Sequence, residues 1–306
     1  MAILEVKNLT KKFKDFTAVD NISFKLEEGE ILGLLGPNGA GKTTTIQMLL
    51  AVLTPSSGEV TYFGKSIFEH RVEILERVNF SSTYINFPWE MTVRENLTYI
   101  SYLYKIKNRK KRIKKIKNIF SLDKLMNKKI RELSDGQKTK INLAKSFINF
   151  PKVLLLDEPT ASLDPDIANK IRKVLKNQRK EFNVSMIFTS HNMAEIEEVC
   201  DRVIFIDKGK IIAKDTPLNL AKSIKSAHVE FMGEEIDKIQ QYCERNEINY
   251  EQEDNYIKVE VKEVMIPQLL KQLAVNNINY DEISIEKPSL EDYFLEVAKQ
   301  DEENRT

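Results

Sequence analysis

The chain has 306 residues, enough for one large domain and a small one, and its 42% apolar and 30% charged content is that of a soluble globular protein. Its 47 lysines and arginines nearly cancel its 46 aspartates and glutamates, so it carries no global electrostatic footprint for nucleic acid, and no specific nucleic-acid partner is expected. The two cysteines, Cys200 and Cys243, form no metal-ligand pattern with the three scattered histidines, which favours a reducing compartment and disfavours a structural zinc site.

Membrane signals are weak along the whole sequence. The opening "MAILEVKNLT" lacks the apolar core of a signal peptide. No window approaches the roughly 18 consecutive apolar residues that a membrane-spanning helix needs. If the protein acts at a membrane, we expect another chain to supply the spans.

Strand-like and helix-like segments follow one another from the start of the chain. The stretches "AILEVKN", "AVDNISFKL" and "GEVTYFG" predict early strands, and the apolar run 30–36 stops at a glycine and leads into the helix-like "KTTTIQMLLAVL". Residues 92–150 look mostly helical, with capping-box patterns at 92–95 and 134–137. The run "VLLLDE" at 153–158 is typical of a strand that is buried on both faces.

The second half continues this alternation and then departs from it. We expect a helix with Asp164 as its N-cap and Pro165 at its first position, followed by a strand that ends near His191, a short helix and a hairpin. Strands alternating with helices predict an α/β fold with a largely parallel sheet. Because the pattern changes near residue 222, we predict a first domain over 1–222 and a separate small α+β domain over 223–306.

The stretch "GPNGAGKT" fits the pattern G-x-x-x-x-G-K-(S/T) and lies between a predicted strand and a predicted helix, as that phosphate-binding loop requires. Glycines let backbone amides close around a phosphate, and the helix start adds partial positive charge. Lys42 should reach the β- and γ-phosphate oxygens, and the Thr43 hydroxyl should bind Mg²⁺. The predicted nucleotide-binding residues of this loop are Gly36, Asn38, Gly39, Ala40, Gly41, Lys42, Thr43 and Thr44.

Two adjacent carboxylates at the end of the buried run 153–158 predict what happens to the nucleotide. An unpaired buried charge is costly, so a metal ion gives these carboxylates a reason to be there. Asp157 should hold Mg²⁺ through water, and Glu158 should face the water that attacks the γ-phosphate. His191 ends the next apolar run, at the strand edge where ligands bind in open α/β sheets, and should contact the γ-phosphate and fix that water.

Taken in order, these motifs resemble those of ABC-type ATPases over about residues 1–220. The resemblance implies a P-loop NTPase fold with a mostly parallel core sheet, an antiparallel β subdomain and a helical subdomain over about 92–150. It also implies that two cassettes pack head to tail, so that "LSDGQ" at 133–137 receives the ATP of the partner in a homodimer. The residues carried over from the resemblance are Phe13, which would stack on adenine, Ser134, Gly136 and Gln137 of the signature, and Asp164, which would face the partner's phosphate loop or cap its own helix.

The sequence departs from the pattern of this family at two important places. Asp135 stands where the family's signature usually has glycine, and its carboxylate would repel a γ-phosphate, so we expect it to point away. The glutamine usually found before the helical subdomain is missing, and its equivalent falls near Ser82 or Thr83. In the family that glutamine binds Mg²⁺ and relays the nucleotide state to the membrane subunit.

The C-terminal stretch "ISIEKPSLEDYFLEVAK" resembles the extension of cassettes that power exporters of drugs, lipids or polysaccharides; the alternative is a generic closing helix. The resemblance thus implies an ATP-hydrolysing subunit of an exporter that binds ATP and Mg²⁺ and drives separate transmembrane permease subunits at the cytoplasmic membrane face. A soluble ABC-type ATPase acting on ribosomes or nucleic acid is the alternative. A nucleotide-binding regulatory subunit with little hydrolysis is a third possibility.

A basic run at 105–118 has nine lysines or arginines in fourteen positions. A solvated helix face, contact with an anionic membrane leaflet and nucleic-acid binding are its three interpretations, the last disfavoured because no aromatic residues interleave to stack bases. The nearby "FPWEM" and "TYISYLYKI" carry aromatic residues that either pack locally or dock a membrane subunit, with Trp89 as the residue to test.

Overall fold

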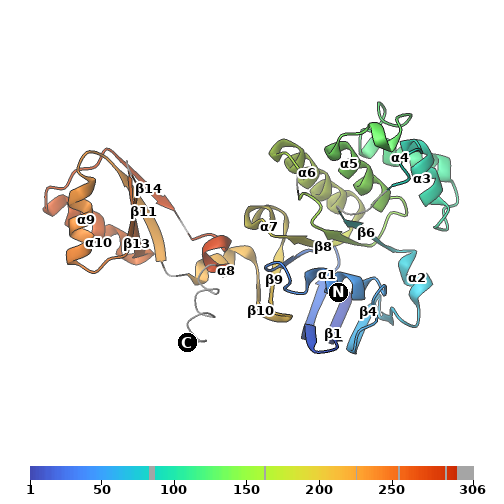
Figure 1. The fold of residues 1–306 in the computed structure, drawn as a ribbon, viewed down its shortest axis with the longest axis horizontal. Coiled ribbons are helices and arrows are strands. Elements are labelled where there is room, and N and C mark those ends of the chain that lie inside the picture. The colour runs from blue at the N-terminus through green and yellow to red at the C-terminus, as the bar shows by residue number, and fades with distance from the viewer. Residues whose placement is uncertain (83–86, 162, 225, 254–255, 287, 295–306) are drawn as a thin grey trace. The chain divides into compact units, whose positions relative to one another are not determined.

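The computed structural model describes residues 1–82, 87–161, 163–224, 226–253, 256–286 and 288–294. The chain divides into two compact units that meet between Thr216 and Pro217 (Figure 1). The predicted boundary at 222–223 therefore falls six residues later than the structural one, because helix α8 (Pro217–Ser223) belongs to the second unit.

The first unit is built on a six-stranded core sheet. Five of its strands pair in parallel, and the edge strand β10 runs antiparallel to β9. Every residue of the three central strands β3, β8 and β7 is buried, as expected for strands covered on both faces. In spatial order the strands are β10 (Lys210–Asp215), β9 (Arg202–Asp207), β3 (Ile31–Leu35), β8 (Ser185–Ser190), β7 (Val153–Asp157) and β6 (Val78–Ser82).

An antiparallel sheet in the order β2-β1-β4-β5 forms the second layer of this unit. A single hydrophobic core joins it to helix α1 (Lys42–Leu49) and to one face of the core sheet. Burying apolar side chains of both layers in that core removes them from water, which is the main force that holds the layers together. The strands are β1 (Ala2–Phe13), β2 (Phe16–Glu27), β4 (Ser57–Tyr62) and β5 (Lys65–Ser66).

Helices make up the rest of the first unit. In Figure 1, helices α3, α4 and α5 lie on one side of the core sheet, and strands β1 and β4 lie on the other side. Both predicted capping boxes are confirmed: Thr92 and Glu95 exchange hydrogen bonds at the start of α3, as do Ser134 and Gln137 at the start of α5. Such caps satisfy amides that the first helical turn leaves unpaired. The helices are α2 (Arg71–Leu75), α3 (Val93–Ser101), α4 (Arg109–Ile119), η1 (Ile130–Glu132), α5 (Asp135–Ser146), α6 (Pro165–Phe182) and α7 (Met193–Val199).

The second unit has the predicted α+β character. Its four strands pair antiparallel in the order β12-β13-β11-β14, with α9 and α10 packed on one face of the sheet, which is the β-α-β-β-α-β arrangement of ferredoxin-like domains. Within the described residues, no helix of either unit is long and apolar enough to cross a membrane. After α8 come β11 (Ser226–Met232), α9 (Ile236–Arg245), β12 (Tyr250–Glu253), β13 (Tyr256–Lys262), η2 (Glu263–Met265), α10 (Ile266–Val275) and β14 (Glu282–Glu286).

Candidate functional site

The loop between β3 and α1 has the shape of a phosphate cradle. Gly36 and Gly41 have positive φ values of 156° and 106°, and a Cβ atom at either position would lie within 2.5 Å of a carbonyl oxygen of a neighbouring strand. At Gly39, by contrast, a Cβ atom would have nothing within 4 Å, so open space lies over the loop. Helix α1 starts at this loop, and no side chain caps its first amides. Asn38 and Thr43 are exposed, Thr44 is half-buried and Ala40 is buried.

Lys42 is the first residue of α1 and lies inside the curve of the loop. It is only 7% exposed, and its Nζ donates to the carbonyl oxygens of Gly36 at 2.7 Å and Pro37 at 3.1 Å. Burial lowers the pKa of the Lys42 ammonium, whereas the nearby carboxylates of Glu158 and Asp157 act in the opposite direction. The loop therefore holds a cation beside two carboxylates, at the place where a polyphosphate would supply further negative charge.

Asp157 is the last residue of β7 and is held from two sides. Its Oδ1 accepts from the Thr189 hydroxyl at 2.8 Å, and its Oδ2 lies 3.5 Å from the Thr43 hydroxyl of the phosphate loop. Asp157 is 7% exposed, and burial raises the pKa of its carboxyl group, against the Thr189 hydrogen bond and the charge of Lys42. The order of the strands brings Asp157 next to Thr189, because β8 lies between β3 and β7 and carries Thr189 opposite Asp157.

Glu158 follows β7 directly and forms a pair with His191. The Nδ1 atom of His191 lies 2.7 Å from Oε2 of Glu158, with the imidazole largely exposed and the carboxylate mostly buried. Glu158 has a φ of 49°, a left-handed conformation that is unfavourable for a residue with a long side chain and that recurs at functional sites. The Glu158 amide donates to the Thr189 hydroxyl at 2.9 Å, which stabilises that turn.

Thr43 and Asp157 suit Mg²⁺, since a hydroxyl and a carboxylate oxygen are the hard ligands that this cation prefers. Across the described ranges, no group of three histidines, cysteines, aspartates or glutamates could hold a metal ion by itself. A magnesium ion at this position would therefore depend on the nucleotide phosphates and water for the rest of its ligands, as is usual for phosphate-loop proteins.

A buried glutamate, which no sequence motif marks, links the segments that follow β7 and β8. Glu195, in α7, is 8% exposed and accepts from the hydroxyls of Thr160 at 2.6 Å and Ser190 at 3.1 Å. Its other oxygen accepts from Arg172 of α6 at 2.9 Å. Thr160 lies two residues after Glu158, and Ser190 directly precedes His191, so one carboxylate fixes the supports of both. Thr189 was likewise missed, because a threonine inside a strand has no distinctive sequence signal.

The signature segment lies at the start of α5, in the helical part of the first unit and apart from α1 in Figure 1. Ser134 is exposed, and Gly136 and Gln137 are half-buried. Asp135 is 89% exposed and forms an ion pair with Lys138 at 2.9 Å, so its carboxylate is turned toward solvent and a cation. A Cβ atom at Gly136 would come within 2.7 Å of Ile167 in α6, which gives this glycine a packing reason to be small.

Phe13 and Asp164 are both at exposed ends of their elements. Phe13 closes β1 and is 46% exposed, with Lys11 over its ring at 5.0 Å, so the ring is not a core residue of the first sheet. Asp164 is the N-cap of α6, as predicted, but its side chain makes no capping hydrogen bond. Only its carbonyl oxygen accepts, from the amides of Ile167 and Ala168. The exposed carboxylate therefore does not cap its own helix.

The expected position of the missing glutamine lies at the end of the edge strand β6. Ser82 pairs with Asp157 in the sheet, is 5% exposed, and its carbonyl oxygen accepts from the Asn142 side chain of α5. Thr83 and Ser162 lie outside the described residues. The signature helix α5 is thus tied to the strand next to Asp157 through Asn142.

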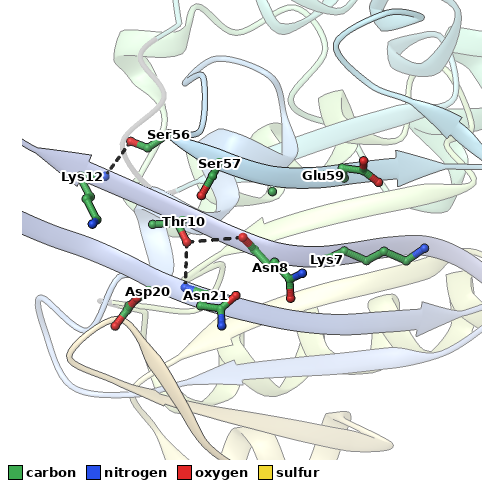
Figure 2. Close-up of a pocket in the computed structure, with 10 residues that line it drawn as sticks. Lys7, Asn8, Thr10, Lys12, Asp20, Asn21, Ser56, Ser57 and Glu59 are labelled. Carbon is green, nitrogen blue, oxygen red and sulfur yellow. Dashed lines mark hydrogen bonds between the residues drawn. The ribbon is translucent and has the colours of Figure 1, made fainter.

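A polar cavity of about 890 Å³ lies on the antiparallel sheet, and none of the predicted site residues lines it (Figure 2). It coincides with irregular pairing of β1 and β2, where Asn8 and Asn21 have positive φ values. The buried Thr10 hydroxyl is satisfied there, since it donates to the Asn8 carbonyl oxygen and accepts from the Asn21 amide at 3.0 Å. The hollow is explained by these β-bulges, which displace residues from the ladder.

Comparison with known proteins places this site in a family. Residues 19–161 match the family model described as "ABC transporter". The chain is 31% identical over 299 residues to the bacitracin transport ATP-binding protein BcrA of Bacillus licheniformis, covering 96% of this chain and 97% of that protein. It is 31% identical over 305 residues to the Nod factor export ATP-binding protein I of Cupriavidus metallidurans, covering 97% of both.

Two further matches cover less of the chain. The sulfate/thiosulfate import ATP-binding protein CysA of Bradyrhizobium diazoefficiens is 36% identical over 242 residues, covering 76% of this chain and 70% of that protein. Among solved structures, cbiO1 from Clostridium perfringens, part of the ABC transporter complex cbiONQ, matches with a TM-score of 0.66 at 27% identity. That match covers 80% of this chain and 97% of cbiO1. The predicted fold class, a P-loop cassette of the ABC type, is confirmed.

Proposed function

Since the chain belongs to the ABC transporter ATP-binding proteins, we propose that it is the ATP-hydrolysing subunit of a membrane exporter. In this proposal it works as a homodimer at the cytoplasmic face of the membrane and drives separate transmembrane permease subunits. The observation that carries the proposal is the similarity to transport and export ATP-binding proteins over nearly the full chain.

The site residues have distinct tasks in hydrolysis. The amides of the phosphate loop and of the start of α1 would bind the β- and γ-phosphates, and the Lys42 ammonium would balance their charge. Thr43 and Asp157 would hold Mg²⁺, which supplies further charge neutralisation at the phosphate oxygens. Glu158 would accept a proton as a water oxygen bonds to the γ-phosphorus and the bond from that phosphorus to the ADP oxygen breaks. His191, paired with Glu158 at 2.7 Å, would fix the carboxylate in that position.

The homodimer explains why one chain has two phosphate receivers. The phosphate loop and the signature segment each combine a helix start with small residues, and one nucleotide has a single triphosphate. If two copies pack head to tail, Ser134, Gly136 and Gln137 of one copy meet the γ-phosphate bound by the other. The exposed Ser134, together with an Asp135 side chain drawn toward Lys138, supports this arrangement.

The share of this chain that each relative matches favours export over import. The relatives named for bacitracin transport and Nod factor export match this chain over 96% and 97% of its length, which includes the second unit. The sulfate/thiosulfate import protein matches over only 76%. None of these relatives is named for ribosomes or nucleic acid, so a soluble ATPase of that kind is not favoured.

The permease contact is proposed to involve exposed aromatic residues of the helical part. Trp89 is 66% exposed, and Tyr99 of α3 is 56% exposed. Tryptophan and tyrosine are enriched where proteins contact one another. We expect Trp89 to lie against a cytoplasmic helix of the permease.

Affinity purification from gently solubilised native membranes tests this function. The tagged chain should recover a multi-span membrane protein in stoichiometric amount, identified by mass spectrometry. Trp89→Ser should reduce that recovery, whereas Val264→Ser, which changes an 83% exposed residue of the second unit, should not. Recovery of ribosomal proteins or DNA-bound factors without a membrane protein would leave the cassette assignment intact and refute the transporter function.

A further inference from the structure

The basic run at 105–118 is chemically one-sided. Its fourteen residues include nine lysines or arginines and no aspartate or glutamate, although the two signs nearly balance in the whole chain. Most of the run forms helix α4. A helix face that only needs to be soluble ordinarily mixes both signs, because like charges three or four residues apart destabilise the helix. The absence of any acidic residue therefore calls for a partner with negative charge.

The two arginines of α4 are already engaged within the protein. The Arg109 guanidinium stacks over the Tyr102 ring at 4.5 Å and donates to the Ser101 carbonyl oxygen. Arg112 lies over the Phe150 ring at 3.9 Å and donates to the carbonyl oxygen of Ile148, two residues after α5 ends. Such cation–π contacts and backbone hydrogen bonds fix the α4 backbone against its neighbours. Neither arginine is therefore directed at an outside ligand.

The lysines divide into an engaged pair and an outward stripe. Lys115 lies over the rings of Phe150 and Phe182, and Lys117 forms an ion pair with Asp123. The other five lysines are exposed and, among the described residues, have no acidic partner within 4.0 Å; they are Lys105, Lys107, Lys110, Lys111 and Lys114. Within α4, Lys110 and Lys111 lie four and three residues before Lys114, which places these three lysines on one side of the helix. We call these three residues, together with Lys107 two positions before the helix starts, the lysine stripe.

Exposed apolar side chains lie a few residues before the stripe in the sequence, in and just after α3, the helix that contacts α4. Leu103 is 64% exposed, and Tyr99, one helical turn before it, is 56% exposed. Tyr102 is exposed as well, with Arg109 over its ring. Lysines together with exposed leucine and tyrosine are typical of surfaces that rest in the interfacial region of a lipid bilayer.

We infer that the lysine stripe and the adjoining Leu103 form a contact surface for the anionic headgroups of a phospholipid membrane. Lysine ammonium groups act as point charges that suit mobile headgroups, whereas the arginine forks that would hold a nucleic-acid backbone bidentately are occupied. One face of the Tyr102 ring, which could otherwise stack a base, is already occupied by the Arg109 guanidinium. The choice of a membrane as the surface rests on the proposed function, in which this chain works beside a bilayer. The contact itself does not depend on a permease.

Vesicle flotation with the purified full-length chain tests the inference. We expect binding to vesicles that contain phosphatidylglycerol and much weaker binding to vesicles of phosphatidylcholine alone. Binding should fall as salt rises from about 0.05 to 0.5 M, because the Debye length shortens. Each lysine near an anionic surface contributes about a fivefold factor, so replacing Lys110, Lys111 and Lys114 by glutamine should lower partitioning on the order of a hundredfold.

The matched control replaces three exposed lysines on other helices, Lys173, Lys180 and Lys271, by glutamine, which removes the same charge elsewhere. Equal loss in both triple variants, or no binding of the wild type to anionic vesicles, would overturn the inference. Preference for a single-stranded oligonucleotide over anionic vesicles would overturn it in favour of nucleic acid. ATP hydrolysis in solution should be unchanged in the stripe variant, so a failure here is distinguishable from a failure to recover a permease.

Discussion

Thr189 connects the two acidic residues of the site through a single hydroxyl group. It is fully buried in β8, donates to Asp157 at 2.8 Å and accepts from the Glu158 amide at 2.9 Å. Replacing it with valine keeps the shape of the side chain almost unchanged and removes both hydrogen bonds. The substitution thus tests whether this hydroxyl positions the carboxylates for hydrolysis.

The size of the effect follows from what is left unpaired. A buried donor or acceptor that loses its partner costs about 1–3 kcal/mol, and here one amide and one carboxylate oxygen are affected, so the local cost is about 2–6 kcal/mol. Without the Thr189 hydroxyl, Asp157 should be less well oriented toward Mg²⁺. Loss of a hydrogen-bond partner of a metal ligand lowers metal affinity or activity by about 10–100-fold. We expect the Mg²⁺ concentration for half-maximal ATP hydrolysis to rise by about that factor in Thr189→Val.

The assay is phosphate release at saturating ATP over a range of Mg²⁺ concentrations. Thr189→Ser retains the hydroxyl and should stay close to wild type in Mg²⁺ dependence, which separates the hydrogen bonds from packing. Thermal unfolding of both variants monitors stability independently. If Thr189→Val hydrolysed ATP with the wild-type Mg²⁺ dependence and rate, the Thr189 hydroxyl would have no role in positioning Asp157 and Glu158.

Three further outcomes are expected. Glu158→Gln should lower phosphate release by at least about a hundredfold and stabilise an ATP-bound dimer in gel filtration; unchanged turnover would remove Glu158 from its role. Glu195→Gln removes the negative charge that faces Arg172. We expect kcat to fall by a larger factor than the KM for ATP changes. If the variant instead lost stability to the same extent as activity, Glu195 would have a purely structural role. Burial lowers the pKa of Lys145 to about 8 from 10.5, so the unfolded chain binds this proton more tightly. At pH 7, Lys145→Met should therefore need more urea to unfold, with a free energy of unfolding higher than that of the wild type by on the order of 2 kcal/mol. This difference in free energy should vanish as pH rises from about 8 to above 10. A difference that does not depend on pH would contradict the reasoning.

Much of the local structure could be predicted from sequence because its causes lie within a few residues. The glycines at 36 and 41 suit the positive φ values of their own backbone, and the capping boxes at Thr92 and Ser134 join residues three apart. The burial of all of β7 follows from an uninterrupted apolar run. The ion pair that draws Asp135 away from its helix start also lies three residues along the chain.

Side-chain contacts and the domain boundary were harder to predict, because they depend on packing between elements. The position of Asp164 before Pro165 correctly predicts an N-cap, yet its side chain makes no capping hydrogen bond in the structure. The predicted domain boundary lies after α8, whereas the contacts within the chain group α8 with the second unit. The sequence pattern also could not separate the lysines of α4 that lie on aromatic rings from those that face outward.

The sequence by itself determined the elements of this protein, the phosphate loop and the strand ends that carry Asp157, Glu158 and His191, since these depend on local backbone chemistry and on contiguous apolar runs. Only the tertiary structure decided which strand ends are neighbours. With β8 between β3 and β7, Thr189 and Glu195 lie where they can hold residues that are more than thirty positions away in the chain. Hydrogen bonds of that kind have no sequence pattern, because their partners become adjacent only once the sheet order is set.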